Sequence, residues 1–261
     1  MEYVVISITA LIVSALTLFS GFGLGTILMP AFALFFPIQV AIAATAVVHL
    51  ANNIFKVILV GRKANWKVVL RFTLPAALAA ILGAWLLNLL SETQAIATYQ
   101  IGDRTQEVTL IKLVIGVLII VFALLELIPR LKKMSFDKKY LPVGGALSGF
   151  FGGLSGNQGA LRSAFLLKTG LDKEAFIGTN AVSGFIVDIV RLIVYSASFY
   201  TSNLTLITGE LRILVLIAIV FAFIGSFFGA KLVKKVTFTA IQLIVGIMLL
   251  IVGAGLAVGL L

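Results

Sequence analysis

Charged side chains are scarce in this chain of 261 residues, because Asp, Glu, Lys and Arg together make up only 11 % of it. A soluble globular domain carries about 25 %. Hydrophobic residues make up 61 %, and the mean hydropathy is +1.18. No polar stretch is long enough to form a separate soluble domain. The composition therefore predicts an integral membrane protein.

Cysteine is absent, and histidine occurs once, at His49. These counts exclude disulfides, a thiol nucleophile and a metal site built from cysteines or several histidines. The chain also lacks a Gly-x-Ser-x-Gly elbow, a His-Glu-x-x-His pair, a carboxylate pair and a phosphate loop with its Lys-Ser/Thr. We therefore expect no enzyme, no cofactor and no ATP-driven transport by this chain alone.

The net charge of +10 could suit nucleic acid. Most of the Lys and Arg residues, however, lie in short loops between apolar runs, as they do in the cytoplasmic loops of membrane proteins. We therefore expect the lipid bilayer as a partner, and no nucleic acid.

Glycine, with 24 residues, interrupts two apolar segments. The first glycine cluster is residues 20–25 (Ser-Gly-Phe-Gly-Leu-Gly), and the second is residues 154–159 (Leu-Ser-Gly-Asn-Gln-Gly). In lipid, backbone groups freed by a helix break must be satisfied by protein or by a water-filled cavity. Paired interruptions in the two halves of a transporter indicate its substrate site. The alternative is close helix packing, which small residues permit.

The apolar runs predict eight membrane segments, at residues 3–36 (broken), 39–60, 68–90, 109–128, 140–167 (broken), 175–199, 211–230 and 238–260. A fixed offset aligns Gly25 with Gly159 and Thr45 with Thr179, which indicates an ancient duplication. We predict an all-α polytopic membrane protein of two transmembrane repeats, residues 1–128 and 140–261. A basic cytoplasmic linker, residues 129–139, joins them.

Loop charge predicts the orientation. Lys and Arg cluster at residues 62–71, 130–139 and 231–235, which we expect in the cytoplasm, whereas loops 91–108 and 200–210 are expected outside. Eight full crossings would place 231–235 outside. If each broken segment instead turns back at its glycine cluster, the basic loops share one face and the repeats are inverted. Eight conventional spans, or a tilted first span, remain alternatives.

Polar side chains surround the second cluster, and helix N-termini that start after Gly25 and Gly159 would attract an anion. Thr45 and Thr179 begin the helices that face the two breaks. The residues that we expect to bind substrate are Gly21, Gly23, Gly25, Thr45, Asn52, Asn53, Ser155, Gly156, Asn157, Gln158, Gly159, Arg162, Thr179 and Asn180.

Ionisable residues inside apolar runs are costly in lipid and indicate a cavity or a partner. His49 and Lys56 share one face of segment 39–60 with Asn52 and Asn53, and Asp188 and Arg191 lie three residues apart. We expect His49, Lys56, Asp188 and Arg191 to act in coupling or gating. The alternatives are a mutually neutralising Asp–Arg pair and a lysine that reaches the cytoplasmic face.

The order of these features resembles the sulfite exporter TauE/SafE family. In the first half it is Gly21-x-Gly-x-Gly25-x4-Pro30, then Ala41-x3-Thr45 and the basic loop from Arg62; in the second half it is a glycine-rich run followed by residues 178–180 (Gly-Thr-Asn). The resemblance covers nearly the whole chain. The chain departs from a plain glycine motif at residues 155–159, where polar side chains replace apolar ones.

The resemblance implies a multi-pass carrier of the prokaryotic inner membrane that exports small sulfur oxyanions such as sulfite or organosulfonates. Alternating access around the two glycine clusters is the expected mechanism, coupled to protons or driven by the membrane potential. An anion channel, an uptake carrier for another small anion, and a scaffold that uses the glycines only for packing remain alternatives, and a homodimer is left open.

Overall fold

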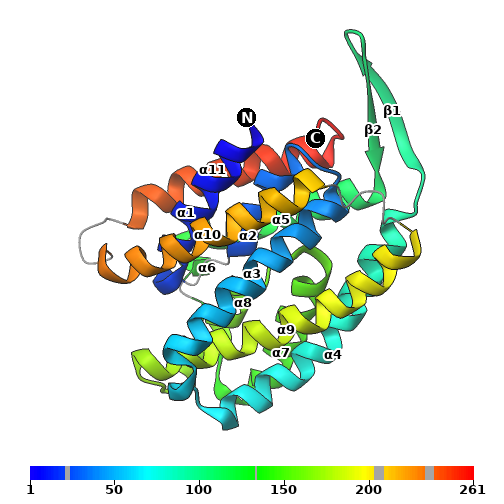
Figure 1. The fold of residues 1–261 in the computed structure, drawn as a ribbon. Coiled ribbons are helices and arrows are strands. Elements are labelled where there is room, and N and C mark those ends of the chain that lie inside the picture. Colours follow the sequence, from blue (N-terminus) through cyan, green and yellow to red (C-terminus); the bar gives the residue numbers. More distant parts are fainter. Residues whose placement is uncertain (21–23, 133, 203–208, 233–237) are drawn as a thin grey trace.

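The computed structural model describes residues 1–20, 24–132, 134–202, 209–232 and 238–261. Its long helices follow the predicted apolar segments, which confirms the all-α polytopic class (Figure 1). They are α1 (Glu2–Ser20), α2 (Leu24–Ala33), α3 (Ile38–Val60), α4 (Trp66–Ser91), α5 (Leu110–Leu127), α7 (Leu141–Ser155), α8 (Gly159–Leu166), α9 (Lys173–Ser202), α10 (Gly209–Leu232) and α11 (Phe238–Ala257). Shorter elements are α6 (Pro129–Lys132) and the 3-10 turns η1 (Gly61–Lys63), η2 (Lys138–Tyr140) and η3 (Leu167–Thr169).

Four stretches within the described residues are long and apolar enough to cross a membrane, namely Ile38–Lys63, Trp66–Ser91, Lys173–Ala197 and Gly209–Gly229. Shorter apolar helices cover Glu2–Ala15, Leu24–Ala33, Leu110–Leu125 and Gly246–Ala257. The chain is thus a multi-pass membrane protein.

Local sequence sets several helix ends. The Asn65 side chain caps α4 by accepting a hydrogen bond from the backbone of Val68 (3.2 Å), and Thr109 caps α5 in the same way (3.3 Å to the nitrogen of Lys112). Helix α7 is followed by Gly156, whose φ of +79° is a left-handed conformation that glycine adopts without strain and that ends the helix.

The predicted outer loop 91–108 is not irregular but forms a β-hairpin. Strands β1 (Ala95–Ile101) and β2 (Arg104–Thr109) pair antiparallel and project from the helices (Figure 1). Gly102 has a φ of +59° at the first position of the two-residue turn, as a type II′ turn requires. The hydroxyl of Tyr99 donates a hydrogen bond to the carbonyl of Val258 (2.5 Å), which attaches the hairpin to the end of α11.

Glycine lets several helices touch through their backbones. On α7, the points where Gly145, Gly149 and Gly153 would carry a Cβ lie within 2.2 Å of carbonyl oxygens of α4. On α10, Gly225 and Gly229 face the carbonyl oxygens of α1 in the same way. No larger residue fits these positions without separating the helices. Close packing, one of the two interpretations of glycine in this chain, therefore applies to these helices.

Helices of the first half pack mainly against helices of the second half. Helix α1 packs on α10 and α7 packs on α4, so the first segment of each half meets the third long helix of the other half. Helix α3 packs on α9, and α5 packs on α11, so these helices pair with their counterparts. Inverted repeats would produce this pattern, although the repeat relationship and the boundaries 1–128, 129–139 and 140–261 stay predictions.

Each broken segment begins and ends at the same end of the molecule, and the two segments use opposite ends. A small cavity at one end is lined by Glu2, Tyr3, Phe35, Phe36, Glu210 and Leu214. The start of α1 and the end of α2 therefore lie together. From that end α3 runs its 23 residues, about 34 Å, to the other end.

At this second end, Lys63 forms an ion pair with Glu174 (3.4 Å). The Lys138 ammonium nitrogen lies 3.5 Å from the point where Gly170 would carry a Cβ. The start of α7 and the end of α8 therefore lie together here. Lys63 and Lys138, one from each of the first two predicted cytoplasmic loops, therefore share this end. Lys133 and part of the third basic group lie outside the described residues.

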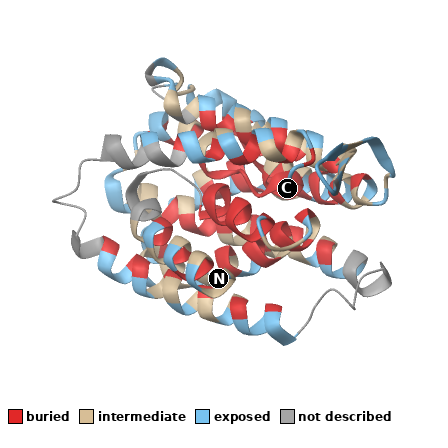
Figure 2. Cartoon of the chain, turned by 90° about the horizontal axis from the view of Figure 1, so that it is seen from above, coloured by how far each residue is buried: buried red, intermediate tan, exposed pale blue. Residues whose placement is uncertain are grey.

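The buried residues lie inside the helix bundle (Figure 2). Many of the exposed residues are large apolar side chains. On α4 a stripe of large exposed apolar side chains comprises Leu70, Leu74, Leu78, Leu82 and Trp85. Spacing near four residues places them on one helix face, the face that lipid would cover. The interior of the bundle is where a site must lie.

We predict that Gly149→Ala destabilises the protein, because the new Cβ would lie 1.9 Å from the Ala76 carbonyl oxygen. Overpacking costs about 1–3 kcal/mol, so the melting temperature in detergent should fall by about 5 °C. The matched control is Gly209→Ala, since no atom lies within 4 Å of the corresponding point. Equal melting temperatures for the two variants would contradict the α4–α7 backbone contact.

Candidate functional site

The centre of the molecule holds a buried carboxylate, Asp188 of α9, whose exposed fraction is 0 %. Its Oδ2 accepts hydrogen bonds from His49 Nδ1 (2.6 Å) and Asn53 Nδ2 (2.7 Å). Its Oδ1 accepts one from Gln158 Nε2 (3.1 Å) and pairs with Arg191 (Nε 3.1 Å, Nη2 2.8 Å). We call these five residues the Asp188 network. It joins α3, α9 and the connection between α7 and α8.

Simple spacing aligns these side chains. His49 and Asn53 lie four residues apart on α3, and Asp188 and Arg191 lie three apart on α9, so each pair shares a helix face. Gly184, one turn before Asp188, leaves the space that the network fills, since a Cβ there would lie 2.8 Å from Asn53 Nδ2.

Two side chains of α9 bind the end of α7. Arg191 Nη1 donates to the carbonyl of Gly152 (3.2 Å), and the hydroxyl of Tyr195 donates to the carbonyl of Gly153. The carbonyl of Gly152 also accepts a hydrogen bond from the backbone of Gly156 (3.0 Å), so the contacts from α9 add to the capping of the last turn of α7. Sequence reasoning missed Tyr195, although it lies one turn beyond Arg191 on the same face and its position could have indicated it.

Arg162 of α8 is a buried cation with neutral partners. Its side chain is 4 % exposed, its Nε donates to Asn180 Oδ1 (2.5 Å), and its Nη1 donates to Gln158 Oε1 (3.1 Å). No carboxylate among the described residues forms an ion pair with it. Gln158 therefore bridges Arg162 and Asp188, and the site has two guanidinium groups for one carboxylate. A buried charge without a counter-ion is costly, so this excess positive charge fits an anion.

Several buried polar atoms near these groups have no hydrogen-bond partner in the described part of the chain. They are both amide atoms of Asn157, the hydroxyl of Thr45 and the amide nitrogen of Asn52. The carbonyl oxygen of Asn52 accepts a bond from Ser226 (2.6 Å). Buried polar atoms normally have a partner, so unpaired ones indicate a ligand or water.

The two glycine clusters meet. A Cβ on Gly25 would lie 2.7 Å from the carbonyl oxygen of Gly156, so α2 touches the connection between α7 and α8. Gly21 and Gly23 lie outside the described residues. The second cluster separates the two helices, because α7 ends at Ser155 and α8 begins at Gly159.

Among the predicted polar side chains that the structure describes outside the Asp188 network, three also lack a hydrogen bond with Arg162 or an unpaired buried polar atom. Ser155 donates to the carbonyl of Phe151 in its own helix (3.0 Å), and Thr179 accepts a bond from the backbone of Asn65 (3.0 Å). Lys56 is half-buried on α3 and takes no part in the hydrogen bonds of the network. The substrate-binding and gating roles predicted for these three residues stay predictions.

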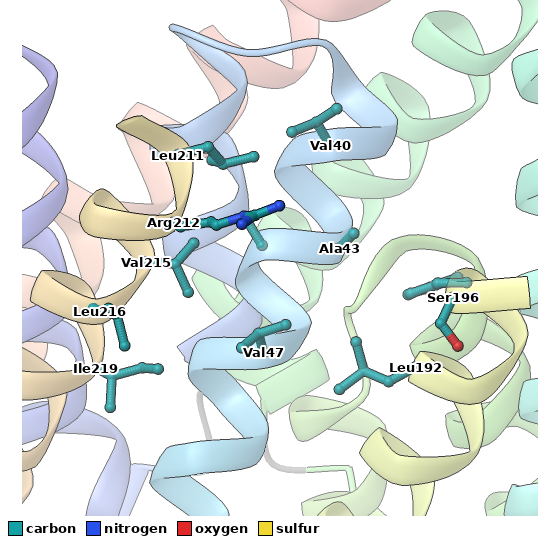
Figure 3. A pocket seen from close by; sticks show the side chains of 12 residues that line it. Val40, Ala43, Val47, Leu192, Ser196, Leu211, Arg212, Val215, Leu216 and Ile219 are labelled. Carbon is teal, nitrogen blue, oxygen red and sulfur yellow. The ribbon is translucent and has the colours of Figure 1, made fainter. Parts of the chain in front are cut away.

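A separate cavity of about 440 Å³ opens between α3, α9 and α10 (Figure 3). Its lining is mostly apolar, and it includes Val47, Leu192, Leu216 and the side chain of Arg212. Tyr195 also lines it and so lies between this cavity and the Asp188 network. Apart from Arg212, Ser196 and Tyr195 its lining residues are apolar, so it offers fewer polar groups than the centre of the molecule does.

The fold and its buried, charged centre define a multi-pass membrane protein of the transporter class. The family model described as "Sulfite exporter TauE/SafE" matches residues 6–256, so the chain belongs to this family of membrane transporters. The resemblance seen in the sequence is thereby confirmed. No curated protein and no solved structure matches the chain.

We predict that Arg191→Met leaves Asp188 buried without its ion pair. Breaking a buried pair costs about 3–5 kcal/mol, so the melting temperature should fall by about 10 °C. The double variant Arg191→Met/Asp188→Asn should recover part of this loss, because no buried charge then lacks a partner. Strictly additive losses in the double variant would show that the two groups do not depend on each other.

Proposed function

We propose that this protein is a secondary transporter that exports small sulfur oxyanions, such as sulfite or organosulfonates, across a prokaryotic inner membrane. The observation that carries the proposal is Arg162, a buried guanidinium with only neutral partners. Family membership supports the transporter class and the sulfur chemistry. The anion and the direction of transport belong to the proposal.

The substrate would bind between Arg162 and the two glycine clusters. Sulfite and sulfonate oxygens only accept hydrogen bonds, and this region offers donors: the guanidinium of Arg162, the amide of Asn157 and the hydroxyl of Thr45. The first backbone N–H groups of α8, from Gly159 onward, would add donors and a favourable helix dipole. Gly25 and Gly156 allow the backbones on either side to approach closely.

The mechanism that we propose is alternating access, with one repeat moving against the other. The broken segments start from opposite ends of the molecule and meet at the centre, as inverted repeats around a central site would. Asp188, Arg191 and Arg162 are at most 4 % exposed, which favours a closed carrier over an open pore. A substrate must then enter by movement of the protein.

Two assays test the proposal. Purified protein is heated with sulfite, sulfate, thiosulfate, taurine or sulfoacetate, and a ligand of the native state raises the melting temperature as its concentration rises. Sulfite flux and counterflow exchange are then measured in proteoliposomes. Selective stabilisation together with exchange supports a carrier, whereas unitary currents without exchange would indicate a channel. No stabilisation and no flux would leave a scaffold as the better interpretation.

We predict that Arg162→Gln lowers sulfite flux by about 30-fold, because a buried contact with an ion is worth about 2 kcal/mol or more. Its melting temperature should not fall, since a buried charge without an anionic partner is removed. The control is Arg212→Gln, an exposed arginine of α10 away from the proposed site, which should change flux by less than about twofold. A lower melting temperature with unchanged flux would give Arg162 a structural role instead.

A further inference from the structure

The Asp188 network contains the donors that an oxyanion would need, and Asp188 already occupies them. His49 and Asn53 donate to one carboxylate oxygen, while Gln158 and Arg191 donate to the other. Each oxygen therefore has two donors within 3.1 Å. A carboxylate and a sulfonate are both acceptor-only groups with delocalised charge, so the same donors suit either.

We propose that Asp188 is an internal anion that holds the place of the substrate in the empty carrier, and that an external anion replaces it only when the His49–Asp188 pair has taken up one proton. This inference rests on the proposed function and names its coupling. It explains why one site combines an excess of cationic groups with a carboxylate at its centre.

Gln158 connects the two anion positions. Its Nε2 donates to Asp188, and its Oε1 accepts from Arg162. An anion at Arg162 therefore lies one side chain away from the carboxylate. Two negative charges this close in a buried site repel each other strongly, because little solvent screens them. One proton removes that repulsion and frees donors of the Asp188 network for the substrate.

The added proton stays within the His49–Asp188 pair. His49 Nδ1 donates to Asp188 Oδ2, so this ring is neutral with Nε2 unprotonated, or becomes a cation when Nε2 gains a proton. The added proton resides on His49 Nε2 or on the Asp188 carboxyl group. In both cases the pair gains one positive charge as the site gains one monoanion, so the total charge of the site is unchanged.

No other titratable group on the packed elements serves this role as well. Arg162 and Arg191 are guanidinium cations, Lys56 of α3 takes no part in the hydrogen bonds of the Asp188 network, and Tyr195 donates its hydroxyl proton to a carbonyl. Helices α2 and α7 contain no titratable side chain, and both basic residues of α4, Lys67 and Arg71, are exposed. The His49–Asp188 pair is therefore the group that exchanges a proton.

One proton would then accompany one monoanion in the same direction. The membrane potential would not act on the neutral sum of the two, and the combined gradients of anion and proton would drive transport. This outcome separates proton linkage from transport driven by the membrane potential.

The first experiment uses the unmodified protein. Methanesulfonate is the probe, since its own charge is constant between about pH 5 and about pH 8, unlike that of sulfite. Proton uptake is read with an indicator dye in weakly buffered detergent solution as the probe binds. We expect about one proton per bound anion at the alkaline end, where the affinity should weaken by about tenfold per pH unit. Binding without proton uptake and with constant affinity would overturn the proposal.

The second experiment compares Asp188→Asn with Asp103→Asn, an exposed residue in the hairpin turn. Asp188→Asn removes the internal anion, so the probe should bind equally well across the pH range and release or take up no proton. Asp103→Asn should behave as the unmodified protein does. If Asp188→Asn fails to fold, the proton count on the unmodified protein decides. If methanesulfonate and sulfite bind at no pH, the proposed function falls as well, whereas pH-independent binding overturns only the proton linkage.

Discussion

A charge inside a membrane protein must find a partner within the protein, and the arrangement of this molecule follows from that requirement. The carboxylate of Asp188 accepts hydrogen bonds from side chains of α3, of α9 and of the connection between α7 and α8. These contacts hold the broken second segment against the two central helices. Arg191 and Tyr195 strengthen the same junction by binding carbonyls at the end of α7. The polar centre is thus a structural joint as well as the proposed site.

Glycine complements this joint by allowing the helices to approach. Along α4 and α7 the backbones touch, and α1 and α10 touch in the same manner. In lipid, packing and interhelical hydrogen bonds are what bring helices together, because apolar burial distinguishes little between lipid and protein. Close backbone contact around a small polar centre therefore suits an apolar chain in which charge is scarce. Gly156 of the second cluster differs from these packing glycines, since it adopts a left-handed conformation.

Much of the fold could be predicted from the sequence because lipid imposes a simple rule on it. Apolar runs gave helix positions that differ from the structure by a few residues, and polar residues within those runs marked the Asp188 network. His49, Asn53, Asp188 and Arg191 were all predicted, since each is too costly in lipid to lack a role. The hairpin was missed because an outer loop of mixed polarity was interpreted from charge alone. Its alternating residues and its Gly-Asp turn were the available signal.

The sequence does not predict which polar side chains form hydrogen bonds with each other. Nothing in the sequence indicates that Gln158 rather than Ser155 reaches Asp188, since both are polar residues of the second glycine cluster. Thr45 and Thr179 align in the sequence, yet one hydroxyl has no partner among the described residues and the other is bound by Asn65. These differences depend on how helices from separate halves are rotated against each other, and helical periodicity does not specify that rotation.

The exchange of contacts between the halves also has a consequence for how the protein is made. Chains are synthesised from the N-terminus, so α1 and α4 enter the membrane before α10 and α7 exist. The faces that these later helices cover must meanwhile contact lipid or other proteins. Neither half can complete its own interior during synthesis. The helices of the first half are therefore synthesised before their packing partners. The final structure forms only after the helices of the second half have been inserted and have packed against them.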